Sequence, residues 1–183
     1  RRVIKVSEIM IAGSGGQGIL APGVMLPNAG LLAGLQTTWL PSYGATMRGG
    51  TANCFVKIDS EEIGSPYIDE ADFLLAFNEP SLLKFHGTVK KGGCIFANSS
   101  LIRKEVPRSD VNVFYVPATE RARELGDVRT ANVFMLGVLF SKTALLPYES
   151  AAASLEDYFS AKSEKVIELN KRVFRAGYEW KEG

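Results

Sequence analysis

The chain has only one histidine, His86, and only two cysteines, Cys54 and Cys94, among 183 residues. A Ser/His/Asp triad would have to use His86, and no G-x-S-x-G stretch supports one. One histidine excludes a histidine-based metal site, and two thiols outside a C-x-x-C pair exclude a four-cysteine cluster. We therefore expect no catalytic residue and no metal ligand, and we expect both thiols to be reduced and buried, as in a cytoplasmic protein.

Long apolar runs and an excess of one charge are also missing. The formal net charge is +1, so a polyanion partner such as a nucleic acid is not predicted. No apolar run reaches the roughly 18 residues that a membrane span needs, and Arg1–Lys5 is not followed by a secretory apolar segment. A chain of this length can bury roughly 70% of its unfolded surface. We expect one domain over residues 1–183.

The most informative stretch is Ile9–Gly18, where a short apolar run ends in a glycine-rich turn. Gly13, Gly15 and Gly18 have the GxGxxG spacing, which is typical of a strand that leads into a helix whose N–H groups face a ligand or another chain. The turn alone is a weak signal. A tight strand-to-helix crossover with close backbone approach would need the same glycines.

Strand and helix patterns alternate along most of the chain. They predict an α/β fold with a Rossmann-like open, mostly parallel sheet, helices on both faces and a C-terminal helical segment. Strands are expected at 7–12, 35–40, 51–58, 72–77, 94–97 and 111–116, and helices at 16–34, 80–85, 119–125, 130–143, 147–159 and from about 166 to 177. The strict alternation in 51–58 predicts an edge or antiparallel strand.

Single residues refine the predicted helices. Pro22 and Pro27 are expected to kink or break the first one. Thr130 is a candidate cap for the helix over 130–143, which is apolar almost all round and therefore predicted to be buried. In the last helix, Glu168 and Arg172 are spaced as an i,i+4 ion pair, and Gly177 is expected to end the helix.

A nicotinamide-binding fold normally offers an acidic residue about 20 residues after the glycines, at the end of the second strand. The corresponding stretch, Gln36–Ser42, contains no carboxylate. A phosphate-binding Walker loop is also excluded, because Ile19 follows Gly18 where that motif has lysine. A nucleotide therefore remains an alternative for the glycine turn rather than its first interpretation.

The loop over 42–50 contains Ser42, Tyr43 and Arg48, followed by Gly49 and Gly50. A cation beside glycines, with exposed backbone N–H groups, suits a carboxylate, a phosphate or the acidic face of a partner. A solvated loop with one surface arginine is the simpler alternative.

The two glycine-rich segments together resemble the gamma subunit of 2-oxoacid:ferredoxin (acceptor) oxidoreductases, which act on pyruvate, 2-ketoisovalerate or 2-oxoglutarate. The resemblance covers nearly the whole chain. Its carriers are Gly13-Ser14-Gly15-Gly16-Gln17-Gly18, Pro41-Ser42-Tyr43-Gly44, Arg48-Gly49-Gly50, Ile63–Pro66, Asp72–Ala76, Gly92-Gly93 and Asn132–Gly137. Thr46 departs from the family, which often has an acidic residue there.

The resemblance implies a subunit of an enzyme rather than a whole enzyme. Such complexes oxidatively decarboxylate a 2-oxoacid with coenzyme A and give acyl-CoA, CO₂ and reduced ferredoxin. Thiamine diphosphate and iron–sulfur clusters are expected in the alpha, beta and delta or ferredoxin-like partner subunits, and ferredoxin is the expected acceptor. The isolated chain is expected to be inactive and able to form a homodimer.

The candidate contacts to coenzyme A or to a partner subunit come from both glycine-rich segments: Gly13, Gly15, Gly16, Gln17, Gly18, Ser42, Tyr43, Arg48, Gly49 and Gly50. Two alternatives stay open. One is a free-standing nucleotide-binding oxidoreductase, and the other is a purely structural scaffold. The sequence does not distinguish among the possible 2-oxoacids.

Overall fold

A computed structural model describes residues 7–43 and 51–182 of the chain. Its strands form one six-stranded sheet in the order β2-β3-β1-β4-β5-β6. Their bounds are β1 Ser7–Ser14, β2 Gln36–Tyr43, β3 Thr51–Asp59, β4 Ala71–Ala76, β5 Val89–Asn98 and β6 Asn112–Val116. Strands β1, β4, β5 and β6 are parallel neighbours, whereas β3 is antiparallel to both β1 and β2. The expected mostly parallel α/β sheet is confirmed.

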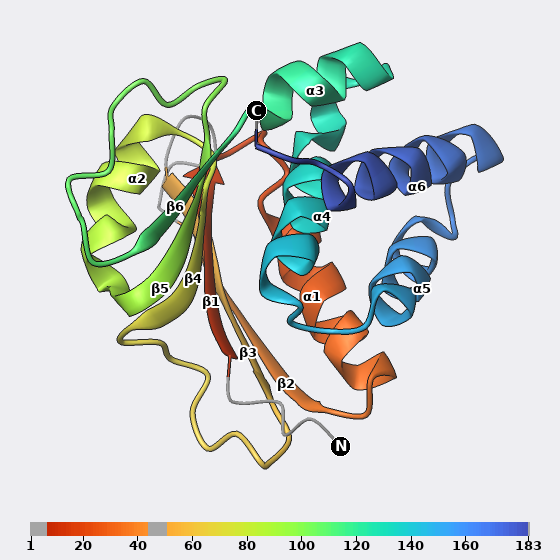
Figure 1. Ribbon diagram of the computed structural model, residues 1–183. Coiled ribbons are helices and arrows are strands. Elements are labelled where there is room, and N and C mark those ends of the chain that lie inside the picture. Colours follow the sequence, from red (N-terminus) through yellow and green to blue (C-terminus); the bar gives the residue numbers. More distant parts are fainter. Residues whose placement is uncertain (1–6, 44–50, 183) are drawn as a thin grey trace.

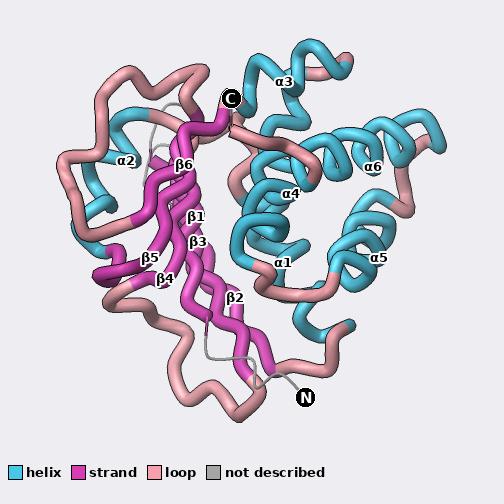
Figure 2. Tube along the Cα trace, in the orientation of Figure 1, coloured by secondary structure: helices cyan, strands magenta, loops and turns pink. Residues whose placement is uncertain are grey.

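The helices divide unequally between the two faces of the sheet (Figure 1). Within residues 7–43 and 51–182, α2 is the α-helix on one face, together with the loop before β6 (Figure 2). Helices α1 and α4 lie on the opposite face, and α3, α5 and α6 pack against them on that side. The bounds are α1 Leu20–Leu32, α2 Glu79–Phe85, α3 Ala118–Leu125, α4 Ala131–Thr143, α5 Tyr148–Phe159 and α6 Glu164–Tyr178, with 3₁₀ turns η1 His86–Thr88 and η2 Val128–Thr130. No described helix combines the length and apolar character needed to cross a membrane.

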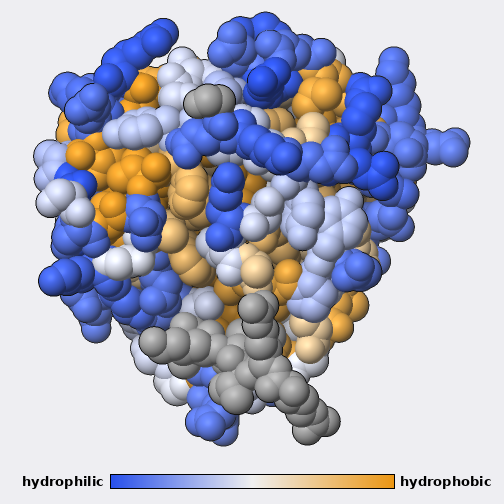
Figure 3. All heavy atoms as spheres, viewed as in Figure 1, coloured by the Kyte–Doolittle hydropathy of each residue, from blue (hydrophilic) through white to orange (hydrophobic). Residues whose placement is uncertain are grey.

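The alternation of side chains along the strands explains why both faces need cover. On β1, Ile9 and Ile11 belong to the large core under α1 and α4, while Met10 and Ala12 belong to the smaller core under α2. Since successive strand residues point to opposite faces, a strand buried on both sides is apolar at every position. On the surface, hydrophobic side chains gather in a patch over α2, and the surface near the outer ends of α3 and α6 is mostly hydrophilic (Figure 3).

Strand β3 is antiparallel, as its alternation predicts, but it is not an edge strand. It lies between β1 and β2 and pairs with both along its whole length. Lys57 lies on the α2 side and pairs there with Glu8 at 3.0 Å, so its polar face contacts protein rather than solvent. The edge position belongs to β2.

The helix predictions hold for element type and differ from the structure at four residues. Helix α1 is not broken at Pro22 or Pro27. Pro22 falls in the first turn, where backbone N–H groups have no intrahelical partner. Thr130 does not cap α4 with its side chain; its hydroxyl donates to the Asp127 carbonyl at 2.7 Å. Gly177 does not end α6, which continues to Tyr178. The burial predicted for α4 is confirmed, because residues 131–140 are all buried.

Candidate functional site

The glycine turn lies at the carboxyl edge of the parallel strands, between β1 and α1. Strands β1 and β4 are neighbours, yet α1 covers one face of the sheet and α2, which follows β4, covers the other (Figure 1). Where the connections leave adjacent parallel strands toward opposite faces, the carboxyl ends separate and leave a crevice, the usual ligand position in open α/β sheets. The topology therefore places the predicted glycine motif at such a point.

The Gln17 side chain stabilises the turn through hydrogen bonds within the protein. Its Oε1 accepts hydrogen bonds from the Ser14 N–H at 2.7 Å, the Ser14 hydroxyl at 3.0 Å and Asn78 Nδ2 at 3.1 Å. Its Nε2 donates to the Phe77 carbonyl at 3.2 Å. Both ends of the amide are thus used within the protein. The sequence predicts Gln17 as a contact to a ligand or partner, whereas its observed bonds join the end of β1 to the end of β4.

Two glycines of the motif are required by close packing. A Cβ on buried Gly13 would lie 2.5 Å from Ile19 Cδ1 and 2.8 Å from Gln17 Oε1. Gly18 has φ of +66°, and a Cβ there would lie 2.6 Å from Asn132 Nδ2, which donates to the Gly18 carbonyl at 2.9 Å. Gly15, Gly16 and Gly18 are all exposed at the surface of the turn.

Asn98 extends the polar lining to the end of β5. It is 1% exposed, and its Nδ2 donates to Thr119 Oγ1 at 2.8 Å and to the Phe77 carbonyl at 3.5 Å. Asn98 and Asn132 were not predicted as site residues. The available signal was an amide side chain at a strand end and at a helix start, which is too common to distinguish them without the fold.

Two cavities open beside this edge. One, of about 220 Å³, is lined by Gly16, Gln17, Asn98, Thr119 and Arg129, with an apolar remainder. The second, of about 390 Å³, lies beside Asn132 and also includes Arg129. Arg129 binds the Asp127 carboxylate through Nε at 3.0 Å and Nη2 at 2.6 Å, and these hydrogen bonds lower the pKa of Asp127. The site therefore offers amides, a hydroxyl and one guanidinium.

The second predicted segment begins and ends at the same edge. In the sheet register Tyr43 lies opposite Ala52, and Thr51 lies opposite Ser14. Ser42 is exposed. The candidate residues Arg48, Gly49 and Gly50 lie outside the described residues. The fold thus places both ends of this segment at the same edge of the sheet as the end of β1, with Thr51 directly beside β1 and Tyr43 one strand further away.

A dinucleotide bound at the glycine turn would have a different strand beside β1 than in the usual dinucleotide-binding fold. In the dinucleotide fold the second strand lies directly beside the first, so that its carboxyl end can hold the ribose. In this chain β3 separates β2 from β1. The lack of a carboxylate in β2 is therefore matched by a topology that moves β2 away from the glycine turn.

The two thiols are free, as predicted. Cys54 is buried, and burial raises the pKa of its thiol to about 12. The prediction that both thiols are buried is wrong for Cys94, which is only half-buried. Its partial burial still raises the pKa of its thiol. Neither has the lowered pKa of a nucleophilic cysteine. Among the described residues, no three His, Cys, Asp or Glu side chains form a group that could hold a metal ion.

Comparison with known proteins shows which family this fold belongs to. The pyruvate ferredoxin/flavodoxin oxidoreductase family matches residues 8–180. The chain belongs to this family. Among solved structures, a keto/oxoacid ferredoxin oxidoreductase gamma subunit from Geobacter sulfurreducens PCA is similar with a TM-score of 0.81 and 28% identity, over 94% of this chain and 96% of that one. The resemblance to gamma subunits is thereby confirmed.

Family members differ in how this unit is built into a longer chain. The ketoisovalerate oxidoreductase subunit VorA of Methanothermobacter marburgensis is 40% identical over 94% of this chain, which spans only 36% of VorA. The 2-oxoglutarate synthase subunit KorC of Methanothermobacter thermautotrophicus is 32% identical and is matched over 93% of its length. The chain therefore spans about a third of the length of one relative and nearly all of the other.

Two further relatives bear on function. The common gamma subunit of the pyruvate and ketoisovalerate oxidoreductases of Thermococcus litoralis is 28% identical over 94% of each chain. The 2-oxoglutarate:ferredoxin oxidoreductase of Magnetococcus marinus, solved with 2-oxoglutarate, coenzyme A and succinyl-CoA bound, has a TM-score of 0.86 and 26% identity. This chain matches over 95% of its length and covers 30% of that one.

Proposed function

We propose that the chain is the gamma subunit of a 2-oxoacid:ferredoxin oxidoreductase and supports CoA-dependent oxidative decarboxylation without catalysing it. The observation that carries the proposal is the match over nearly the full length of both this chain and a solved gamma subunit. The complex converts a 2-oxoacid and coenzyme A to acyl-CoA and CO₂ while ferredoxin is reduced. Thiamine diphosphate and the iron–sulfur clusters belong to the alpha, beta and delta or ferredoxin-like subunits, and the complex is cytoplasmic.

The carboxyl edge of the sheet is the part of the chain that faces the partners and the coenzyme A entrance. Its support is geometric. The braced glycine turn, the cavity of about 220 Å³ and both ends of the 43–51 connection share this edge. Exposed Gly15 and Gly16 offer backbone N–H groups, which suit phosphates or a partner's carboxylates.

The choice of 2-oxoacid belongs to the partner subunits. One gamma subunit serves both a pyruvate and a ketoisovalerate enzyme in Thermococcus litoralis, as its name states. A subunit that served two substrates would not form the pocket that distinguishes them. The 2-oxoacid substrate must therefore be identified by assaying the assembled complex, because this chain alone does not determine it.

A native anaerobic pull-down of the chain from its own cells tests the assignment. We expect subunits that contain thiamine diphosphate and iron–sulfur clusters to co-purify, and the complex to reduce a viologen dye only with both coenzyme A and a 2-oxoacid. A panel of pyruvate, 2-oxoisovalerate, 2-oxoglutarate and indolepyruvate then identifies the substrate. A chain recovered without partners and with a bound nucleotide would overturn the proposal.

The site assignment is tested by Arg48→Ala in the assembled complex. Removing the cation is expected to raise the apparent KM for coenzyme A about 10-fold, or to weaken assembly, because a guanidinium binds phosphate or carboxylate groups. Lys91→Ala is the control, since Lys91 is an exposed cation near the start of β5, at the opposite edge of the sheet. Unchanged assembly and unchanged KM in the Arg48 variant would remove this loop from the site.

A further inference from the structure

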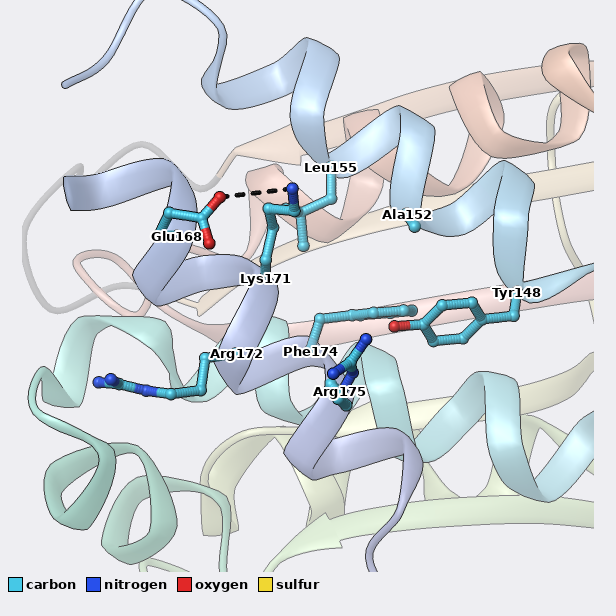
Figure 4. A pocket seen from close by; sticks show the side chains of 8 residues that line it. All are labelled: Tyr148, Ala152, Leu155, Glu168, Lys171, Arg172, Phe174 and Arg175. Carbon is cyan, nitrogen blue, oxygen red and sulfur yellow. Dashed lines mark ion pairs between the residues drawn. The ribbon is translucent and has the colours of Figure 1, made fainter. Parts of the chain in front are cut away.

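A third cavity, distant in sequence from the glycine turn, lies between α5 and α6. It has a volume of about 340 Å³ and is lined by Tyr148, Leu155, Phe174, Arg175 and neighbouring residues. Figure 4 shows the side chains of Tyr148 from α5 and of Phe174 and Arg175 from α6 at the same side of the cavity. The volume falls at the lower end of the range of small-molecule sites. Neither the family assignment nor the carboxyl edge of the sheet involves this cavity.

Arg175 is an exposed side chain at the cavity, and its guanidinium has no protein partner among the described residues. Among residues 7–43 and 51–182, its side chain has no hydrogen bond, ion pair or ring contact. The other cations of the cavity are engaged. Lys171 Nζ lies 2.8 Å from Glu156 and 3.4 Å from Glu168, so the i,i+4 pair predicted between Glu168 and Arg172 is not formed. Arg172 Nη2 donates to the Leu125 carbonyl at 2.7 Å.

The floor of the cavity is a rigid aromatic cluster. The Tyr148 ring centroid lies 5.5 Å from that of Phe174 and 4.8 Å from that of Tyr178. These contacts fix the Tyr148 ring and so fix the direction of its hydroxyl. Leu155 adds an apolar wall. A guanidinium and a phenol above an apolar floor are the complement of a molecule with an anionic head and an apolar body.

We propose that the cavity between α5 and α6 binds a small organic carboxylate with an apolar body, held by Arg175 and Tyr148. A guanidinium matches a carboxylate through two parallel hydrogen bonds, and the phenol supplies another donor. A dianionic phosphate fits less well, because the Glu168 carboxylate also lines the cavity and repels a second negative charge. The proposed ligand is therefore a monoanion.

Calorimetric titration of the full chain with phenylacetate tests this site. We expect a Kd on the order of 1 mM, which Arg175→Gln weakens about 10-fold and Tyr148→Phe about 3-fold. Arg123→Gln is the matched control, because Arg123 is an exposed arginine on α3 outside the cavity, and its Kd should equal that of the wild type. Circular dichroism of each variant verifies that the fold is retained.

Two other probes test the chemistry of the ligand. Benzyl alcohol has the apolar body without the charge, and its weak binding should be insensitive to Arg175→Gln. Phenyl phosphate should bind less tightly than phenylacetate. No saturable phenylacetate binding, equal binding by the Arg175 variant, or tighter phenyl phosphate binding would each overturn the proposal. The same titration of the assembled complex must also show phenylacetate binding. The absence of binding there would also overturn the proposal.

Discussion

At the scale of single residues, the glycine turn depends on Gly18 and on the amide that contacts it. Gly18→Ala should destabilise the chain by about 2 kcal/mol, because φ of +66° strains any other residue and the new methyl group displaces the Asn132 amide. Urea denaturation measures the loss.

Gly16→Ala is the matched control for this substitution. Gly16 also has a positive φ, of +95°, but a Cβ there would meet nothing within 4 Å. Its cost should be about 1 kcal/mol, from backbone strain alone. If both variants lose the same stability, the Asn132 contact contributes nothing and the account of this turn is wrong.

Another residue-scale network joins the opposite end of the sheet. Lys90 Nζ lies 2.7 Å from Glu8 and 3.2 Å from Asp72, and Glu8 also pairs with Lys57. Burial by itself would raise the pKa of Glu8, but its hydrogen bonds and charge interactions with Lys90 and Lys57 outweigh burial and lower it below 4.5. Burial would lower the pKa of Lys90, but Glu8 and Asp72 raise it above 10.5.

These shifts predict a pH window for the network. A carboxylate with a lowered pKa stabilises the fold above its unfolded value, and this contribution is lost as the pH falls through the folded pKa. An ammonium with a raised pKa stabilises below its unfolded value, and this contribution is lost as the pH rises through the folded pKa. Lys90→Met should therefore destabilise by about 1 kcal/mol near pH 7, and the difference from wild type should shrink below pH 4.5 and above pH 10.5.

Thermal denaturation across pH measures this difference. Lys91→Met is the control, because Lys91 is an exposed neighbour for which no ion pair is present among the described residues. A pH-independent difference between the Lys90 variant and the wild type would show that lost packing, not charge, causes the destabilisation.

At the scale of elements, α4 and α6 touch through their backbones. A Cβ on Gly177 would collide with the Phe134 carbonyl oxygen, and a Cβ on Gly137 would collide with the Phe174 carbonyl oxygen. These two glycines let the helix axes approach closely. The sequence-based interpretation of Gly177 as a helix end is wrong. Glycine is needed at this position because the backbone packs directly against Phe134, 43 residues earlier in the chain.

Gly177→Ala should therefore cost about 3 kcal/mol, since backbone atoms cannot move aside as a flexible side chain can. Gly64→Ala serves as the reference substitution, because Gly64 is exposed and a Cβ there meets nothing within 4 Å, and its effect should stay within about 0.5 kcal/mol. Chemical denaturation compares the two. Near-equal denaturation midpoints for the two variants would mean that α4 and α6 can move apart without loss of stability.

At the scale of the whole molecule, the position of β3 separates this chain from dinucleotide-binding proteins. Strand β3 lies between β1 and β2, so no residue at the end of β2 is next to the glycine turn. We expect that NAD, NADP and FAD each raise the melting temperature of the isolated chain by less than about 1 °C, whereas a site filled at 100 times Kd would raise it by roughly 5–10 °C.

Differential scanning fluorimetry measures these shifts, and a known nicotinamide-dependent dehydrogenase provides the positive control. A clear stabilisation by one of the three nucleotides would favour the free-standing oxidoreductase over the subunit. Whether residues 1–183 form one domain, and whether the isolated chain dimerises, stay predictions for limited proteolysis and analytical ultracentrifugation.

Local patterns determined much of this molecule from sequence alone. The alternation of Val56 and Ile58 with polar neighbours indicated an antiparallel strand, the apolar run after Thr130 indicated a buried helix, and the spacing of Gly13, Gly15 and Gly18 indicated a strand-to-helix turn. Each is a short-range property, because side-chain periodicity and allowed φ values depend on adjacent residues.

Only the tertiary structure decided what lies next to what. Gln17 finds the Phe77 carbonyl 60 residues away, and Asn132 finds the Gly18 carbonyl across 114 residues. Gly177 packs on Phe134, and Arg175, Tyr148 and Phe174 line one cavity. Such partners are chosen by how the sheet orders its strands and how the helices pack on it, and many different side chains satisfy the same local pattern. The sequence therefore determined the elements and the family, and the packing of those elements determined the sites.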